Sequence, residues 1–184
     1  MQKEKPKVKD VRLSCGSSSD RKFANLMIPI FQYCGVTYGV SDLSCHRHAG
    51  KGGFDKQVRG YKESVVAVIG GHALHKVGAI KALYQSDGRW QQIVLGVPID
   101  GTARDSIEGL PFGVFPLTAG YNREHPESSI KNHALAVVQL IGLRRPEVLA
   151  KLNDYWQKEI VDAKPRQPEV SLDEKGLAVL PQKK

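Results

Sequence analysis

Five short runs of apolar and β-branched residues recur along this chain, and longer amphipathic segments separate them. This rhythm is typical of strand, helix, strand units in a parallel sheet. The run VVAVI, residues 65–69, is continuous rather than alternating, as expected for a strand that is covered on both faces. We therefore predict an α/β fold with one parallel sheet and VVAVI near its centre. The predicted strands are Val11–Cys15, Val36–Val40, Val65–Ile69, Ile93–Val97 and Val114–Thr118.

Residues at helical spacing fill the segments between these strands. The first predicted helix has Asp20 as its N-cap and Gly35 as its stop, and Pro29 inside it should kink it. Further helices are predicted at about residues 72–84, 126–141 and 146–162. The segment 126–141 is apolar nearly all round, so it should be buried either in the core or against another subunit.

The length of 184 residues suits one domain with a full core and is too short for two ordinary domains. We expect a basic N-terminal tail at 1–10, an α/β domain at 11–163 and a charged tail at 164–184. The first ten residues lack the apolar stretch of an export signal, and no apolar run is long enough to span a membrane. We therefore expect a cytoplasmic protein with no membrane partner. Cys15, Cys34 and Cys45 form no CxxC pair, so we expect reduced thiols.

The formal net charge of +8 is spread over the chain rather than concentrated. Residues 1–10 carry four lysines against one Glu and one Asp, and residues 164–184 carry five basic against three acidic side chains. Each tail thus contributes +2, and +4 remains for the body. A nucleic-acid surface needs clustered Lys and Arg with interleaved aromatic residues. The charge therefore favours a small anionic ligand, and we expect no nucleic-acid partner.

Polar and glycine-rich segments follow the first four predicted strands. They are GSSSD at 16–20, SCHRH at 44–48, GGHALH at 70–75 and GVPID at 96–100. In an open parallel sheet, ligands bind beyond the carboxyl ends of the strands, where such loops meet helix N-termini. The four loops should therefore lie together at one edge of the sheet.

The first two loops favour a phosphorylated ligand. In GSSSD, glycine allows close backbone approach, and serine hydroxyl and amide groups can donate to a phosphate; the alternative is an ordinary N-cap turn. It is neither a Walker loop nor a dinucleotide fingerprint. SCHRH sets His46 and His48 around Arg47, which combines a permanent cation with imidazoles that titrate near neutrality. The alternative is a solvated surface loop.

The third loop leaves two further alternatives open. In GGHALH, Gly70 and Gly71 let a flat ring or carboxylate lie against backbone amides, with His75 beyond them, or they form only a tight turn. A zinc site is also conceivable because soft ligands gather in these loops, but the spacing of known zinc patterns is missing, so we expect no metal. The soft ligands are Cys45, His46, His48, His72 and His75.

These loops, in this order, resemble the bacterial and plant aminoimidazole ribonucleotide carboxylase (PurE) family of purine biosynthesis. That family carries GSxSD after its first strand, SAHR after its second, GGAAHLPG after its third and GVP after its fourth. Here GSSSD matches in full, SCHR replaces SAHR and GGHALHKVG replaces GGAAHLPG. The likeness covers about residues 11–150, with SIEGLPFGVFPL where the family has a segment like SIVQMPAGVPVA. Four motifs in register make the resemblance specific.

The resemblance implies a flavodoxin-like, three-layer, doubly wound sheet and a homo-oligomer, an octamer in the family. It implies N5-carboxyaminoimidazole ribonucleotide mutase or carbon dioxide-dependent carboxylase activity on a small ribonucleotide, with no metal or organic cofactor. His46 matches the general acid and base, and His75 matches the pocket for the carboxylate or carbon dioxide. The substrate-binding residues implied are Ser17, Ser19, Ser44 and Arg47 for the phosphate, Asp20 for the ribose, and Gly70 and Gly71 for the carboxylate.

Three departures from the family pattern support a second hypothesis. HAGKGG stands where the family has a Thr-Pro that starts a helix, and glycines should start one poorly. His72 stands where alanine is usual, and Tyr121–His125 is polar where the family is small and apolar. The alternative is thus a diverged paralogue that binds a phosphorylated nucleotide with altered specificity or without catalysis. An FMN-type electron carrier, which shares the fold class, is a third hypothesis.

Overall fold

Five parallel strands form one sheet in the order β2-β1-β3-β4-β5. The structure is a computed structural model that describes residues 8–72, 74–105, 114–116, 126–161, 171–172 and 178–179. The strands are β1 (Val11–Cys15), β2 (Tyr38–Asp42), β3 (Val65–Gly70), β4 (Ile93–Pro98) and β5 (Val114–Pro116). The chain moves outward from β1 to β2 and then returns to place β3 on the other side of β1. This reversal is the switch point of a flavodoxin-like sheet, so the predicted fold class is confirmed.

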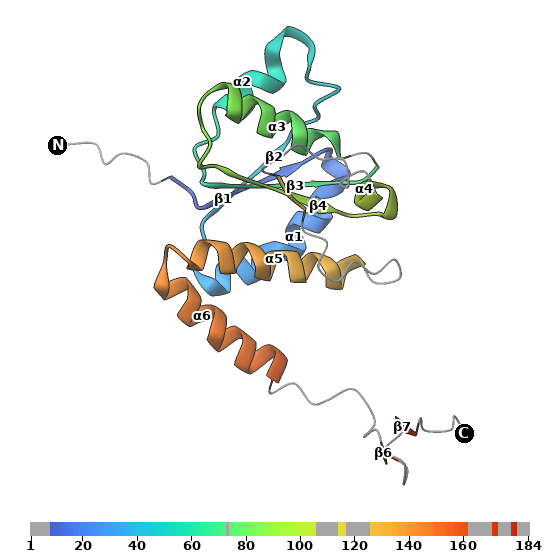
Figure 1. Cartoon of the computed structure of the whole chain (residues 1–184), viewed down its shortest axis with the longest axis vertical. Coiled ribbons are helices and arrows are strands. Elements are labelled where there is room, and N and C mark those ends of the chain that lie inside the picture. The colour runs from blue at the N-terminus through green and yellow to red at the C-terminus, as the bar shows by residue number, and fades with distance from the viewer. Residues whose placement is uncertain are drawn as a thin grey trace, which may run out of the picture. The chain divides into compact units, whose positions relative to one another are not determined.

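Helices cover both faces of the sheet, as Figure 1 shows. On one face lie α1 (Arg21–Cys34) and α5 (Pro126–Gly142), and on the other lie α2 (Gly53–Arg59) and α3 (His75–Ser86). The short turns and helices η1 (Ser18–Asp20), η2 (Gly50–Gly52) and α4 (Gly101–Asp105) follow strands β1, β2 and β4. The sheet is therefore the middle of three layers.

The chain divides into two compact units, Met1–Leu152 and Asn153–Lys184. Helix α6 (Pro146–Trp156) runs across that boundary and is followed by a π-helical turn, η3 (Gln157–Val161). The second unit also contains an antiparallel pair, β6 (Ser171–Leu172) and β7 (Ala178–Val179). Within the part of the chain that the structure describes, no helix is long and apolar enough to cross a bilayer.

The core lies on both faces of β3, where every residue is buried. This confirms the central position predicted from the unbroken run VVAVI. Helix α5 buries its apolar side chains within this chain, since Ile130, Ala134 and Val138 are inaccessible without any second subunit. Of the two alternatives for that segment, the core therefore accounts for its burial.

Several predicted boundaries were wrong by a few residues. Strand β2 begins at Tyr38 rather than Val36, because Gly35 ends α1 in the left-handed region and the Val36 amide still donates to the Phe31 carbonyl. Helix α3 begins at His75 rather than near residue 72, because His72 itself has a positive φ of 52°. The predicted ends Leu117–Thr118 of the fifth strand and the whole segment Tyr121–His125 lie outside the described residues.

The HAGKGG segment begins a helix, contrary to the expectation. Gly52, with φ 66°, is the N-cap residue of α2, a conformation that glycine adopts without strain. The apolar side chains of Phe54 and Val58 on this short helix are buried in the core around α3. Tertiary packing therefore outweighs the low helix propensity of the glycines.

Two buried tyrosines give a test of this packing. The Tyr61 hydroxyl lies 2.8 Å from Ser41 Oγ and 3.3 Å from Ser14 Oγ. Among the described residues, the buried Tyr84 hydroxyl has no hydrogen-bond partner. We expect Tyr84→Phe to leave the free energy of unfolding unchanged or raise it by about 1 kcal/mol, and Tyr61→Phe to lower it by about 1 kcal/mol. Urea unfolding of both variants measures the difference, and a Tyr84→Phe protein less stable than Tyr61→Phe would contradict it.

Candidate functional site

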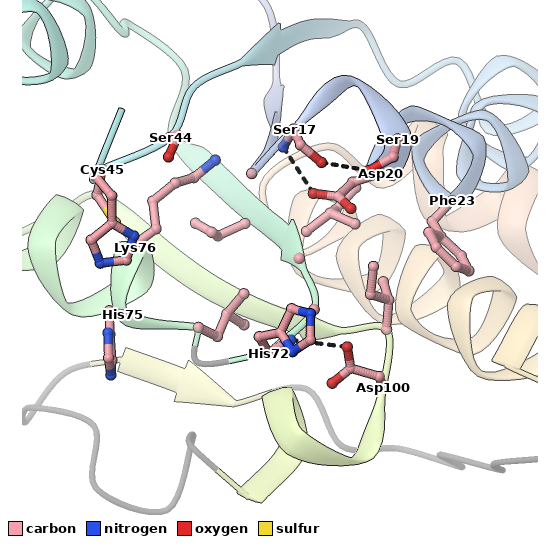
Figure 2. A pocket seen from close by; sticks show the side chains of 18 of the residues that line it. Ser17, Ser19, Asp20, Phe23, Ser44, Cys45, His72, His75, Lys76 and Asp100 are labelled. Atoms are coloured by element: carbon pink, nitrogen blue, oxygen red, sulfur yellow. Dashed lines mark hydrogen bonds between the residues drawn. The ribbon is translucent and has the colours of Figure 1, made fainter. Parts of the chain in front are cut away.

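A cavity of about 600 Å³ opens at the carboxyl ends of β1 and β3, at the switch point of the sheet (Figure 2). Loops from four separate parts of the chain line it. The structure brings together all nine residues predicted for the site, namely Ser17, Ser19, Asp20, Ser44, His46, Arg47, Gly70, Gly71 and His75. Residues outside that prediction also line the cavity: Lys22, Phe23, Cys45, Lys76 and Asp100.

The GSSSD loop is a tight turn held by its own side chains. The Ser17 amide donates to Asp20 Oδ2 at 2.9 Å, and the Ser17 and Ser19 hydroxyls lie 2.6 Å apart. The Gly16 amide donates to the Ile69 carbonyl at 2.9 Å, which fixes the turn to the end of β3. Asp20 directly precedes α1, but its carboxylate caps the turn η1 rather than α1, and in this way it orders the loop whose hydroxyls line the site.

The SCHRH loop separates its two histidines. The His48 ring nitrogen lies 3.0 Å from the Ser44 amide, within the loop, and His48 is not among the residues that line the cavity. His46 does line it, and its ring centroid is 6.0 Å from that of His75, with the planes at 77°. Two imidazoles from different loops thus meet edge to face in the cavity.

Arg47 ties the second loop to the first. Its guanidinium donates to the Gly16 carbonyl at 3.0 Å, and its amide donates to Ser44 Oγ at 3.2 Å. A guanidinium placed beside serine hydroxyls is an arrangement that suits a phosphate group. Arg47 therefore lies where both predicted phosphate loops meet.

Asp100 fixes the loop after β3. Its Oδ2 accepts the His72 amide at 2.9 Å and its Oδ1 accepts the Ala103 amide at 2.7 Å. His72 lies at the cavity wall beside Asp100 (Figure 2). The sequence signal for Asp100 was an Asp two residues after the end of β4 and three residues before a helical amide, which is an N-cap pattern.

Lys76 is another cavity residue that sequence reasoning missed. It lies in the first turn of α3, is buried, and donates to three backbone carbonyls at the ends of β1 and β2. Burial lowers the pKa of this lysine to about 7. The sequence did contain a signal for its burial, because Lys76 is a lysine on the same helical face as Ile80 and that face is otherwise apolar.

The balance of charge in the cavity suits an anion that also carries hydroxyl groups. Lys22, Arg47 and Lys76 supply positive charge, and the carboxylates Asp20 and Asp100 can accept from hydroxyls. Within the described ranges, no group of three or more His, Cys, Asp or Glu side chains has an arrangement that could hold a metal ion.

The close approach of Asp100 to the third loop depends on a glycine. A Cβ at position 71 would overlap Asp100 Oδ2, whereas a Cβ at Gly50 would have no atom within 4 Å. We expect Gly71→Ala to lower the free energy of unfolding by about 1–3 kcal/mol because Asp100 must move. Gly50→Ala, the matched control, should change it by less than about 0.5 kcal/mol. Urea unfolding provides the measurement, and equal stability of the two variants would show that this contact is unimportant.

Comparisons with known proteins agree with the resemblance seen in the four loops. No family model matches the chain. The chain is 29% identical over 166 residues to an N5-carboxyaminoimidazole ribonucleotide mutase of Pyrococcus horikoshii, covering 85% of this chain and 84% of that protein. Its fold is similar to crystal structures of two Treponema denticola proteins, a substituted variant of PurE2 and PurE. The first has a TM-score of 0.62 and 18% identity and covers 83% of this chain and 92% of the other. The second has a TM-score of 0.60 and 18% identity and covers 81% of this chain and 90% of the other.

The loop motifs predicted the family, the archaeal relative matches over most of both chains, and the fold agrees with solved structures. Together these findings show that this chain is similar to an N5-carboxyaminoimidazole ribonucleotide mutase in sequence and to PurE structures in fold.

Proposed function

We propose that this protein catalyses carboxyl transfer on aminoimidazole ribonucleotide in purine biosynthesis, as a mutase of the N5-carboxy derivative or as a carbon dioxide-dependent carboxylase. The observation that carries the proposal is the meeting of His46 and His75 with both serine loops and Arg47 in one cavity. The archaeal relative bears the name of such a mutase. The PurE structures from Treponema denticola have a fold similar to that of this chain.

The substrate phosphate would bind between the first two loops. Ser17, Ser19 and Ser44 offer hydroxyl donors, and Arg47 offers a cation that is already bonded to Gly16 of the neighbouring loop. A fixed phosphate would position the imidazole ring, which is a small and otherwise weakly held group. Asp20, at the inner side of the same turn, would accept from the ribose hydroxyls.

His46 would move the proton that the reaction exchanges. In the mutase reaction, the carbamate N–C bond breaks, carbon dioxide leaves, and His46 gives a proton to the amino nitrogen. The ring carbon then attacks the retained carbon dioxide, a C–C bond forms, and the ring proton passes back to His46. His75, 6.0 Å from His46 between ring centroids, would hold the carboxylate together with Gly70 and Gly71. These steps use no metal or organic cofactor.

A second candidate function is binding of a different phosphorylated nucleotide without this chemistry. It is favoured by His72, which occupies the cavity wall with a positive φ of 52° and a backbone bond to Asp100. Thermal-shift measurement with ribose phosphates and nucleotides separates the candidates, because a ligand raises the melting temperature according to occupancy. Stabilisation by other nucleotides, together with no turnover of the imidazole ribonucleotides, would favour the second candidate.

The assembly and location of the protein belong to the same proposal. We expect a homo-oligomer, an octamer as in the family, and a cytoplasmic location for a purine enzyme. The domain limits 1–10, 11–163 and 164–184 remain a prediction.

Substitution of His46 tests the acid and base role. We expect His46→Asn to lower kcat by about 10² to 10⁴, the usual contribution of a positioned acid or base. Cys45→Ala is the matched control, because it changes the adjacent cavity residue to the alanine of the family's SAHR motif, and it should retain activity. Wild-type and variant proteins are assayed with N5-carboxyaminoimidazole ribonucleotide and with aminoimidazole ribonucleotide plus bicarbonate. Wild-type protein that turns over neither would overturn the proposed activity.

Substitution of Arg47 tests the phosphate position separately. We expect Arg47→Gln to raise KM by about tenfold or more, the loss of one charge-assisted bond, while kcat falls less than in His46→Asn. The same assay gives both constants. An unchanged KM would place the phosphate elsewhere.

A further inference from the structure

Lys76 is a buried charge that the proposed chemistry does not use. Its side chain lines the cavity, yet the residue is only 5% exposed. It is the second residue of α3, so it lies at the positive end of that helix dipole. Both the burial and the dipole disfavour an ammonium group at this position. Something in the local structure must offset these costs.

The offset is a set of three short hydrogen bonds to the protein backbone. Lys76 Nζ lies 2.8 Å from the Ser14 carbonyl, 2.7 Å from the Cys15 carbonyl and 2.8 Å from the Leu43 carbonyl. An ammonium group has three donors, so these carbonyls use all of them. Lys76 therefore has no donor left with which to bind a substrate directly.

The three carbonyls belong to the last part of β1 and the residue after β2. The pairing of these strands ends at Cys15 and Asp42, and the Leu43 amide makes a further bond to the Cys15 carbonyl at 2.9 Å. Beyond that point, β1 and β2 lead into the separate loops GSSSD and SCHRH. One ammonium group thus joins the strand ends where the two loops begin, and Figure 2 shows the Lys76 side chain reaching the start of the second loop near Ser44.

From this geometry we infer that Lys76 is a positioning residue, which joins the ends of β1 and β2 so that the serine hydroxyls and His46 keep the separation that binding and proton transfer require. The inference rests on the proposed function for its catalytic consequence. Its structural part, the ordering of both loops by one amine, stands independently of the reaction.

The protonation state of Lys76 makes the ordering of the two loops depend on pH. The groups that face the amine are Cys15 on β1, Asp42 on β2, Asp20 in η1 and Cys45 in the second loop. Burial raises the pKa of the Cys15 thiol to about 11, so this neighbour is neutral near pH 7. Only the ammonium makes all three bonds, because a neutral amine has two donors.

The sign of this dependence follows from burial. Burial lowers the pKa of Lys76 to about 7, and opening the loops to water would raise this pKa towards its ordinary value. Proton uptake therefore favours the open loops, and the stability of the ordered loops should rise as pH increases through about 7. Because this effect of burial opposes the loss of the third hydrogen bond, substitutions rather than a pH series test the positioning role.

Lys81 provides a matched control on the same helix. It too is 5% exposed, and its Nζ lies 3.5 Å from the Gln92 carbonyl rather than at the strand ends. Lys76→Met and Lys81→Met therefore each remove one buried amine from α3, and only the first removes the bonds to β1 and β2.

Amide hydrogen exchange of the full chain measures the effect without reference to activity. In Lys76→Met we expect protection in peptides covering residues 16–20 and 44–49 to fall by about tenfold or more, with residues 65–70 unchanged. In Lys81→Met the two loops should keep wild-type protection. Wild-type protection of the loops in Lys76→Met, or an equal loss in Lys81→Met, would overturn the inference.

Lys76→Gln, which keeps two amide donors, covers the case in which Lys76→Met does not fold. We expect its protection in residues 16–20 and 44–49, relative to residues 65–70, to fall below that of the wild type, and wild-type protection would overturn the inference. With aminoimidazole ribonucleotide as the probe in the assay above, Lys76→Met should raise KM and lower kcat together. If the wild-type enzyme shows no turnover, the proposed function fails, while the exchange measurements still decide the role of Lys76.

Discussion

The parallel pairing of β1 with both β2 and β3 is the constraint on which the rest of this structure depends. Because all three strands point the same way, their loops open at one edge of the sheet. Because the chain reverses direction across the sheet between β2 and β3, the helices that follow β1 and β3, α1 and α3, lie on opposite faces. The resulting gap above β1 and β3 is the cavity. Any change that shifted this register would separate the serine loops from the histidines.

Loops at a sheet edge are ordered here by single polar side chains that bond to the backbone of a neighbouring loop. Arg47 bonds to the Gly16 carbonyl, Asp100 to the His72 amide, and Lys76 to carbonyls at the ends of β1 and β2. Each of these bonds crosses between elements that are distant in the sequence. Preorganised positions of this kind are what the proposed carboxyl transfer requires, since proximity supplies much of the rate.

Much of the fold could be predicted because it depends on local patterns. The unbroken run VVAVI indicated the central strand, Asp20 and Gly35 bounded α1, and motif order indicated the likeness to the PurE family. The predictions were wrong where tertiary contacts outweighed local preference. The glycines before Phe54 were expected to start a helix poorly, yet burial of Phe54 and Val58 stabilises one. His72 was placed in a helix, but its bond to Asp100 holds it in a turn.

The sequence by itself determined the α/β class, the strands and their buried centre, and the four loops that would carry the site, because hydrophobic periodicity and turn residues act within a few positions of the chain. Only the tertiary structure decided which of the histidines meet and which charges are buried. His46 faces His75 while His48 turns back to Ser44, and Lys76 lies under the loops rather than in solvent. These outcomes depend on strand order and close packing, which bring together residues that no spacing along the chain relates.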